Sequence, residues 1–199
     1  MNEVLLSTAY FPPIEFYHFY TQSDAVTIEQ EEHFIKQTYR NRCRILGANG
    51  ILDLSIPIQK HANNTPIKDI KISYDTPWQK QHWRSIVSAY NSSPFFIYYD
   101  YELVQFFEKR FEFLCDLNIE ILEKMNKLLK ISGTFNLSKE FKALNQITPD
   151  YRFSISPKIK PELKFKTYNQ VFDQKFGFIE NLSILDLLFN KGPESTEFF

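Results

Sequence analysis

The first 28 residues contain two short apolar runs, separated by a proline corner and a segment of helical character. Residues 4–6 and 25–28 each have the composition of a strand. Between them, residues 14–20 follow a Pro-Pro pair, and proline is favoured in the first turn of a helix. A strand, a helix and a second strand in so short a stretch predict a βαβ unit with parallel strands. The chain is therefore expected to be an α/β protein.

A β-hairpin is predicted next, over residues 36–58. Asn49 and Gly50 form a dipeptide that strongly favours a tight turn between two strands. After this turn, apolar and polar residues alternate, which indicates a strand with one buried face. The apolar members of this alternation are Leu52, Leu54, Ile56 and Ile58. A further strand is expected over residues 67–72.

The rest of the chain is predicted to be mainly helical. One helix is expected to start at Pro77, because proline is tolerated at the first helical position. A long helix is predicted over residues 101–130, and a short one after Ser183, which is a favourable capping residue. Residues 131–167 are more polar and are expected to form a connecting segment with one short strand near Phe153.

A length of 199 residues suits a single domain, and one domain over residues 1–199 is the expectation. Its predicted fold class is α/β, with an N-terminal βαβ unit and a mixed sheet with a β-hairpin, followed by a mainly helical C-terminal half. Residues 1–100 would hold the mixed sheet and the candidate site, and residues 101–199 the helical part.

The composition argues against several classes of function. A net charge of −1 gives no global attraction to nucleic acid or to an anionic membrane, so neither is expected as a partner. With 5 glycines and no GxGxxG or GxxxxGK[ST] motif, a glycine-rich phosphate loop is not expected. Two cysteines and no HxxxH pair predict no metal site and no cofactor. Reduced thiols, no signal peptide and no long apolar run predict a cytoplasmic protein.

The stretch 36–44 is rich in cationic side chains that would share one face of a strand. These side chains are Lys36, Arg40, Arg42 and Arg44. Because arginine forks bind phosphate and carboxylate with two hydrogen bonds, one interpretation is an anion site. The alternative is a solvated face whose arginines pair with the acidic residues 29–32 across the sheet. The sequence leaves both open.

His82 lies in an apolar helical stripe, four residues after Trp78 and four before Ile86. It could project into a pocket as a general acid or base. The alternative, which the spacing alone favours, is a core histidine with both ring nitrogens hydrogen-bonded. Tyr10 follows the first strand at its carboxyl end, where open α/β sheets bind ligands, and its ring could stack on a base or sugar. The alternative for Tyr10 is a packed turn.

Several separated motifs in the right order resemble the WbqC-like protein family, and the match covers nearly the whole chain. The strand and proline corner of the family is matched by Ser7-Thr8-Ala9-Tyr10-Phe11-Pro12. The family has a lysine followed by an Asn-Arg pair, which correspond to Lys36, Asn41 and Arg42. Its Leu-Ser-x-Pro segment corresponds to Leu54, Ser55 and Pro57. Its stripe of Trp, His, Ile and Tyr corresponds to Trp78, His82, Ile86 and Tyr90. The sequence departs from the pattern at Ser7-Thr8, which replaces Gln-Pro, and at Glu15, where the family usually has glycine.

This resemblance implies a transferase that moves an amino acid or acyl group, with glycine as one candidate, to a nucleotide-linked sugar in O-antigen or other surface-polysaccharide biosynthesis. His82 and Lys36 would then carry the chemistry. The substrate-binding residues would be Tyr10, Asn41, Arg42 and Tyr90. The partner would be a small molecule, either a sugar nucleotide or an acyl or aminoacyl donor.

Two alternatives to this transferase stay open. The first is a non-catalytic module that binds a sugar nucleotide or a partner protein. The second is a nucleotidyltransferase-like enzyme. The sequence therefore leaves undecided whether the chain is an enzyme at all.

Overall fold

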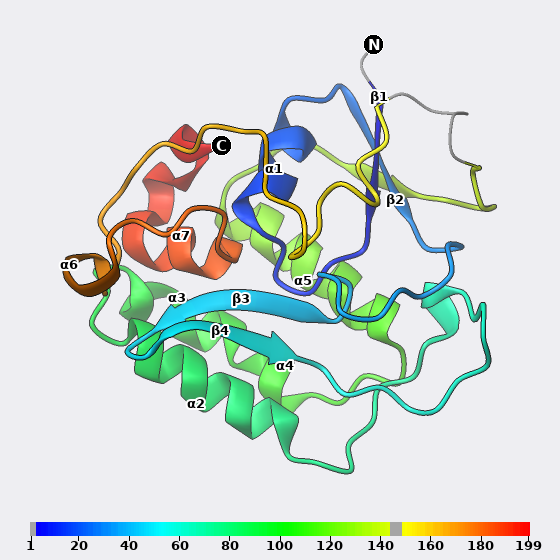
Figure 1. The fold of residues 1–199 in the computed structure, drawn as a ribbon, viewed down its shortest axis with the longest axis horizontal. Helices are drawn as coiled ribbons and strands as arrows, with labels where there is room; N and C mark the ends of the chain where they lie inside the picture. The colour runs from blue at the N-terminus through cyan, green and yellow to red at the C-terminus, as the bar shows by residue number, and fades with distance from the viewer. Residues whose placement is uncertain (1–2, 144–148) are drawn as a thin grey trace.

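A computed structural model describes residues 3–143 and 149–199, and its first element is a three-stranded parallel sheet (Figure 1). The strands lie in the order β1-β2-β5, with β5 at Phe135–Leu137, so that β2 is central. Strands β1 (Glu3–Ser7) and β2 (Ala25–Glu29) are joined by helix α1 (Ile14–Thr21). Val4 pairs with Val26, and both side chains are buried. The predicted βαβ unit with parallel strands is therefore confirmed.

The predicted hairpin is also present. Strand β3 (Arg42–Gly47) pairs antiparallel with β4 (Gly50–Ser55). Helix α2 (Trp78–Tyr90) packs against this hairpin and lies below it in Figure 1. The predicted burial of the apolar residues in the second strand holds for Leu54 and Ile56 but not near the turn, where Leu52 is 41 % exposed.

The single helix predicted over residues 101–130 is wrong. The chain instead forms α3 (Phe96–Leu103), α4 (Gln105–Glu108) and α5 (Leu114–Leu128). The break occurs because residues 109–113 run alongside residues 70–72. Ile72 N–H donates to the carbonyl of Glu112 at 3.0 Å, and Leu114 N–H donates to that of Ile70 at 2.8 Å. These long-range bonds replace the helical ones.

Two short strands were predicted in the wrong place. Residues 67–72 form a 3-10 helix, η1 (Ile67–Asp69), followed by single bridges at Lys71 and Ile72. In the connecting segment, the strand is β5 (Phe135–Leu137) rather than a strand near Phe153. β5 forms because it can add to the free edge of β2.

The C-terminal part packs back onto the N-terminal half. It contains α6 (Asp173–Phe176), α7 (Ile184–Lys191) and the 3-10 helix η2 (Gly192–Phe198). Ser183 caps α7 as predicted, because its Oγ accepts from the N–H of Leu185 at 3.3 Å. Ser183 also bridges Pro13, which places the start of α7 against the start of α1.

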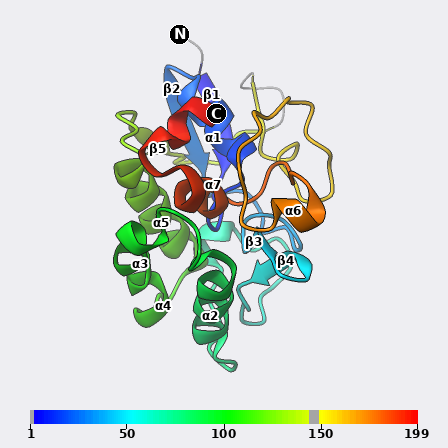
Figure 2. The same cartoon turned by 90° about the vertical axis from the view of Figure 1, so that its left-hand side faces the viewer.

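Figure 2 shows the arrangement from the side, with the parallel strands at the top, α2 at the bottom and α7 between them. The hairpin and α6 lie on the right of this view. The structure confirms the predicted mixed α/β class, with the helices mainly in the C-terminal half. Across residues 3–143 and 149–199, none of the helices combines the length and the hydropathy that crossing a bilayer requires.

Candidate functional site

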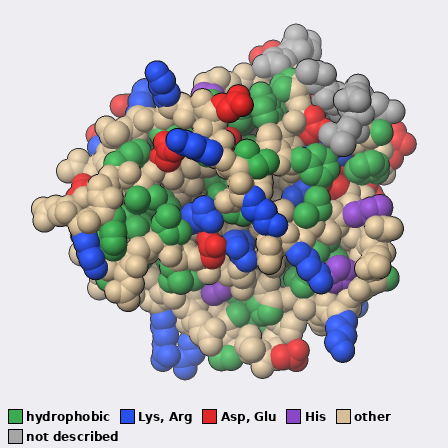
Figure 3. Space-filling view, in the orientation of Figure 1, with side chains coloured by type: hydrophobic (Ala, Val, Ile, Leu, Met, Phe, Trp, Pro, Cys, Tyr) green, Lys and Arg blue, Asp and Glu red, His purple; other side chains and the backbone are tan. Residues whose placement is uncertain are grey.

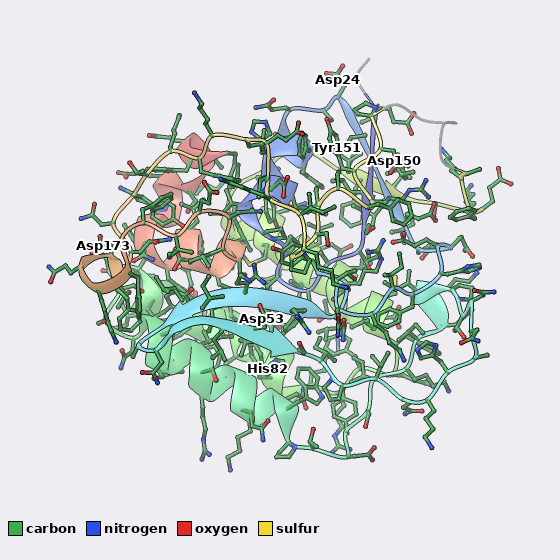
Figure 4. All side chains as sticks on the ribbon, in the orientation of Figure 1. Asp24, Asp53, His82, Asp150, Tyr151 and Asp173 are labelled. Carbon is green, nitrogen blue, oxygen red and sulfur yellow. The ribbon has the colours of Figure 1, made fainter. Side chains whose placement is uncertain are left out.

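The outer face of the hairpin carries a small charged cluster. Asp53 on β4 accepts from Arg42 Nη1 at 3.1 Å and from Arg44 Nε at 3.0 Å (Figure 4). Arg42 also donates to the Ser55 hydroxyl at 3.0 Å. One carboxylate therefore separates two guanidinium groups, which leaves an excess of one positive charge on this face.

The predicted four-residue basic face does not form. Gln37 has a positive φ of 60°, and residues 36–40 form turns ahead of β3. Lys36 is exposed in this turn, whereas Arg40 points inward. Only Arg42 and Arg44 share a strand face, because β3 begins at Arg42.

Arg40 belongs instead to a buried ionic network at the carboxyl ends of β1 and β2. Its guanidinium donates to both oxygens of Glu32, at 2.8 and 2.6 Å, and to Ser7 Oγ at 2.7 Å. Arg152 makes a similar contact, with Glu29 at 3.1 Å and Asp150 at 2.6 Å. The network holds two cations and three carboxylates, so its arginines are already neutralised.

This network fastens the connecting segment to the sheet. Asp150 pairs with Leu5 of β1, and Figure 4 places Asp150 and Tyr151 beside that strand. The interpretation in which arginine pairs with the upstream acidic run thus applies to Arg40 and Glu32. It does not apply to Arg42 and Arg44, whose partner is Asp53.

Asn41 closes the open end of the hairpin. Its Nδ2 donates to the carbonyl of Ile56 at 2.9 Å, and its own carbonyl accepts from the N–H of Ile56 at 2.8 Å. These two hydrogen bonds between Asn41 and Ile56 hold the two strands together. Its role in ligand binding stays a prediction.

His82 and Tyr10 meet beneath the hairpin. The Tyr10 hydroxyl lies 3.1 Å from His82 Nδ1, and both residues are buried. Burial lowers the pKa of His82 to about 4, although a hydrogen bond to the backbone of Ser55 opposes this shift. The imidazole is therefore neutral at pH 7, and its Nδ1 has the Tyr10 hydroxyl as a partner.

Ser55 brings two of the predicted site residues close together. Arg42 bonds to its hydroxyl, and His82 interacts with its backbone. The guanidinium and the imidazole therefore lie on either side of one residue of β4, and not on opposite sides of the molecule. Figure 4 shows His82 on α2 just below Asp53.

Tyr90 lies in a different cluster. Its side chain is fully buried and contacts the ring of Phe189 in α7 at 5.2 Å between centroids. Burial and the nearby Asp186 carboxyl raise the pKa of Tyr90 well above its ordinary value. Asp186 accepts from Tyr168 at 2.7 Å and from Gln170 at 2.9 Å, so Tyr90 belongs to a packed polar group around α7.

A groove of about 480 Å³ opens beside the hairpin. Its three walls are residues 157–161, residues 178–181 and the adjoining part of the hairpin with Tyr39. Figure 3 shows Lys and Arg side chains gathered over the hairpin at the middle of this face. The cationic side chains that line the groove are Arg44, Lys158 and Lys160.

Three groups in these walls are available to a ligand. Lys158 and Lys160 form no ion pair with any residue in 3–143 or 149–199. Tyr39 is only 5 % exposed, yet its hydroxyl makes no hydrogen bond to another described residue. A hydroxyl at a cavity wall with no protein partner among the described residues and two unpaired ammonium groups suit a polar, anionic ligand.

Glu15 stands directly behind this groove. Its Oε2 accepts from Nδ2 of Asn181, a lining residue, at 3.1 Å, and its N–H donates to Asn181 Oδ1 at 2.9 Å. Burial raises the pKa of Glu15 to about 6. Its charge also acts on Tyr39, whose pKa is raised to about 12 chiefly by burial.

The structure brings together some of the residues that the sequence singled out. Tyr10 contacts His82, and Ser55 interacts with both His82 and Arg42. Lys36 and Tyr90 lie apart from this group, and none of these residues lines the groove. Within the described residues, no three His, Cys, Asp or Glu side chains are placed to hold a metal ion.

Sequence reasoning missed the groove itself. Lys158 and Lys160 alternate with exposed Ile159 between two prolines, which is a signal for an extended, basic segment. Tyr39 and Glu15 gave no local signal, because their relation to the groove depends on how distant segments pack. Only the departure of Glu15 from the family pattern could have drawn attention to it.

Comparisons with known proteins agree with the sequence motifs. A sequence model of the WbqC-like protein family matches residues 8–161 and 148–198. The chain is also similar to the uncharacterized protein Rv1507c of Mycobacterium tuberculosis. The identity is 24% over an alignment of 224 residues, and the alignment covers 98% of this chain and 95% of that protein. No solved structure matches the chain.

Proposed function

The chain belongs to the WbqC-like protein family, and we propose that it is a transferase that moves an acyl or aminoacyl group onto a nucleotide-linked sugar for surface-polysaccharide biosynthesis. In this reaction, a nitrogen or oxygen of the sugar forms a bond to the acyl carbon of the donor. The bond from that carbon to the leaving group of the donor breaks, the leaving group keeps the electron pair of that bond, and it takes up the proton that the nucleophile gives up. The support from this chain is the groove beside the hairpin.

The observation that carries the proposal is the set of three cations in one groove. Arg44, Lys158 and Lys160 line it together, and the two lysines have no ion pair with a described residue. A nucleoside diphosphate carries its negative charge on neighbouring phosphates, which ammonium and guanidinium groups bind strongly. We propose that these three side chains hold the diphosphate.

The remaining walls suit the rest of such a ligand. Tyr39 offers a free hydroxyl as a hydrogen-bond donor, and Ile51 and Phe178 offer apolar surface. Pockets for small molecules usually combine apolar surface with a few polar groups that fix the orientation of the ligand. A volume of about 480 Å³ is within the range of ligand pockets.

The catalytic roles of His82 and Lys36 stay predictions. A base works best when its pKa lies near the operating pH, and His82 has a pKa of about 4. We therefore propose that Tyr10 and His82 support the groove indirectly, by fixing β4 through Ser55. Arg42 and Arg44 both form ion pairs with Asp53, and we propose that Arg42 thereby reduces the repulsion between the Asp53 carboxylate and an anionic ligand.

The second candidate function is a non-catalytic module that binds a sugar nucleotide. The observation that favours it is the burial of His82, whose Nδ1 contacts the Tyr10 hydroxyl and whose pKa of about 4 makes it a weak base. A module of this kind would bind the same ligand in the same groove. It would differ only in forming no product.

Product analysis separates these functions. The protein would be incubated with UDP-linked sugars and with acyl or aminoacyl donors, and the sugar nucleotides would be analysed by mass spectrometry. A mass increase that matches the transferred group, and that is lost in Arg44→Met, supports a transferase. Saturable binding without a mass increase supports the binding module. Absence of both binding and product would contradict the use of the groove for nucleotide sugars.

A further inference from the structure

We propose that the groove selects a nucleotide-linked sugar that carries a primary amine, with Glu180 receiving the ammonium group and Glu15 supplying negative charge behind the same wall. This inference rests on the proposed function and names the acceptor as an amino sugar. In this arrangement Glu180 contacts the ligand. Glu15 is a positioning residue that acts through Asn181.

The charges in the groove lie on different segments. The cations Lys158 and Lys160 belong to one wall, residues 157–161. Glu180 and Asn181 belong to another, residues 178–181. Glu180 forms no ion pair with a described residue, so its carboxylate can accept from a ligand. A ligand that spans the groove therefore meets cations from one segment and a carboxylate from another.

Glu15 strengthens the negative character of this second wall. The Pro13–Ser183 bridge and the bond from Ile14 N–H to the Leu182 carbonyl, 3.0 Å long, hold the start of α1 against residues 181–183. Glu15 is thereby fixed on Asn181 by two hydrogen bonds, one accepted by its carboxylate and one donated by its backbone N–H. Only one of its oxygens takes part, and Oε1 has no partner among the described residues.

A carboxylate with only one amide partner is poorly compensated for its burial. In the buried network, by contrast, Glu32 and Asp150 each accept hydrogen bonds from an arginine at both carboxylate oxygens. Glu15 is 6 % exposed and has no cationic partner within the described residues. An ammonium group bound in the groove would supply the missing positive charge.

The ionisation of Glu15 gives this selection a pH dependence. Its pKa of about 6 means that the wall gains a negative charge as the pH rises through that value. The charged groups of the groove in front of it are Glu180, Lys158 and Lys160. The other titratable and charged groups around it are Tyr39 and, beyond Tyr39, Arg44, Asp53 and Cys43. Burial raises the pKa values of Tyr39 and Cys43, so both stay neutral between pH 5 and pH 7. Arg44 stays charged.

The test compares three UDP-linked sugars that differ at one position, which carries an amine, an N-acetyl group or a hydroxyl. Dissociation constants would be measured by calorimetry at pH 7. The amine-bearing sugar should bind about fivefold more tightly than the other two, which is the size of one partly exposed ion pair. Glu180→Gln should remove this preference, whereas Glu162→Gln, outside the groove, should retain it.

Repeating the measurement at pH 5 tests the role of Glu15. In the wild type, the preference for the amine should decrease from pH 7 to pH 5 as Glu15 takes up a proton. Glu15→Gln, which retains an acceptor for Asn181, should show a small preference that does not fall over this range. Protonation of the sugar amine alone would change the preference in the opposite direction, so the two effects are distinguishable.

The outcomes separate this inference from the proposed function. If all three sugars bind with equal affinity, the groove still binds nucleotide sugars, but amine selection is wrong. If the preference for the amine persists in Glu180→Gln, the assignment of the ammonium site is wrong. If none of the three sugars binds, both the proposed function and this inference are overturned.

Discussion

The hydroxyl of Tyr10 lies 3.1 Å from Nδ1 of His82, and this contact joins the turn after β1 to helix α2. Trp78 covers the same imidazole from one turn earlier in α2, at 5.1 Å between ring centroids. Two residues that are 72 positions apart thus meet in the core. Because the imidazole of His82 is buried at this contact, its protonation is expected to lower the stability of the fold.

Stability should fall as the pH decreases from about 6.5 to about 4. His82 has a pKa of about 4 in the folded protein, below its ordinary value of 6.5, because burial disfavours the cation. In this pH range the unfolded chain binds a proton that the folded chain does not, so acid favours unfolding. The loss should be about 3 kcal/mol, at 1.36 kcal/mol for each unit of pKa. Urea denaturation at several pH values measures it.

The contribution of His82 is isolated by comparing the wild type with His82→Gln. The difference in unfolding free energy between the two should shrink as the pH falls through this range. His33→Gln, at an exposed position, serves as the matched control and should follow the wild type. A difference that does not change with pH would show that His82 is not buried in its neutral form.

Tyr10→Phe should destabilise the protein by about 1–3 kcal/mol, because the ring is retained while a buried nitrogen of His82 loses its partner. Thermal or urea unfolding at pH 7 measures this loss. Tyr98→Phe, at a position that is largely exposed, should have almost no effect. Equal stability of Tyr10→Phe and the wild type would contradict the hydrogen bond.

Removing a cation from the buried network should cost far more than removing one from the hairpin surface. Arg152→Met leaves Glu29 and Asp150 without their partner in the core, and the expected loss is about 3–5 kcal/mol. Arg42→Met removes a partly exposed pair, and the expected loss is below about 1 kcal/mol. Urea unfolding of both variants gives the comparison, and similar losses would contradict the assigned burial of the two arginines.

The local elements were predictable where the signal is carried by neighbouring residues. The pair Asn49-Gly50 predicted the tight turn between β3 and β4, although the two turn residues are Ala48 and Asn49 and Gly50 already pairs with Gly47. The proline corner at Pro13 predicted the start of α1. The break between α4 and α5 was not predictable in this way. It depends on residues 109–113 pairing with residues 70–72, which are far away in the sequence.

The candidate site was predictable only in part, for the same reason. Motif positions led to Tyr10, His82 and Arg42. Tyr10 contacts His82, and Arg42 is linked to His82 through Ser55. The groove, however, is built by residues 157–161 and 178–181 crossing beside β3. No periodicity or spacing relates Lys158 or Glu15 to Arg44, because only the tertiary path of the chain brings these side chains to one place.

The binding of a UDP-linked sugar to the double variant Lys158→Met/Lys160→Met tests the central claim most directly. Calorimetry at low ionic strength should show at least a tenfold weaker affinity than in the wild type, since each charged contact to phosphate contributes about 1 kcal/mol or more. Lys71→Met/Lys109→Met removes two exposed lysines outside the groove and should leave the affinity unchanged. Equal affinity of the wild type and the Lys158/Lys160 variant would contradict the groove as the phosphate site.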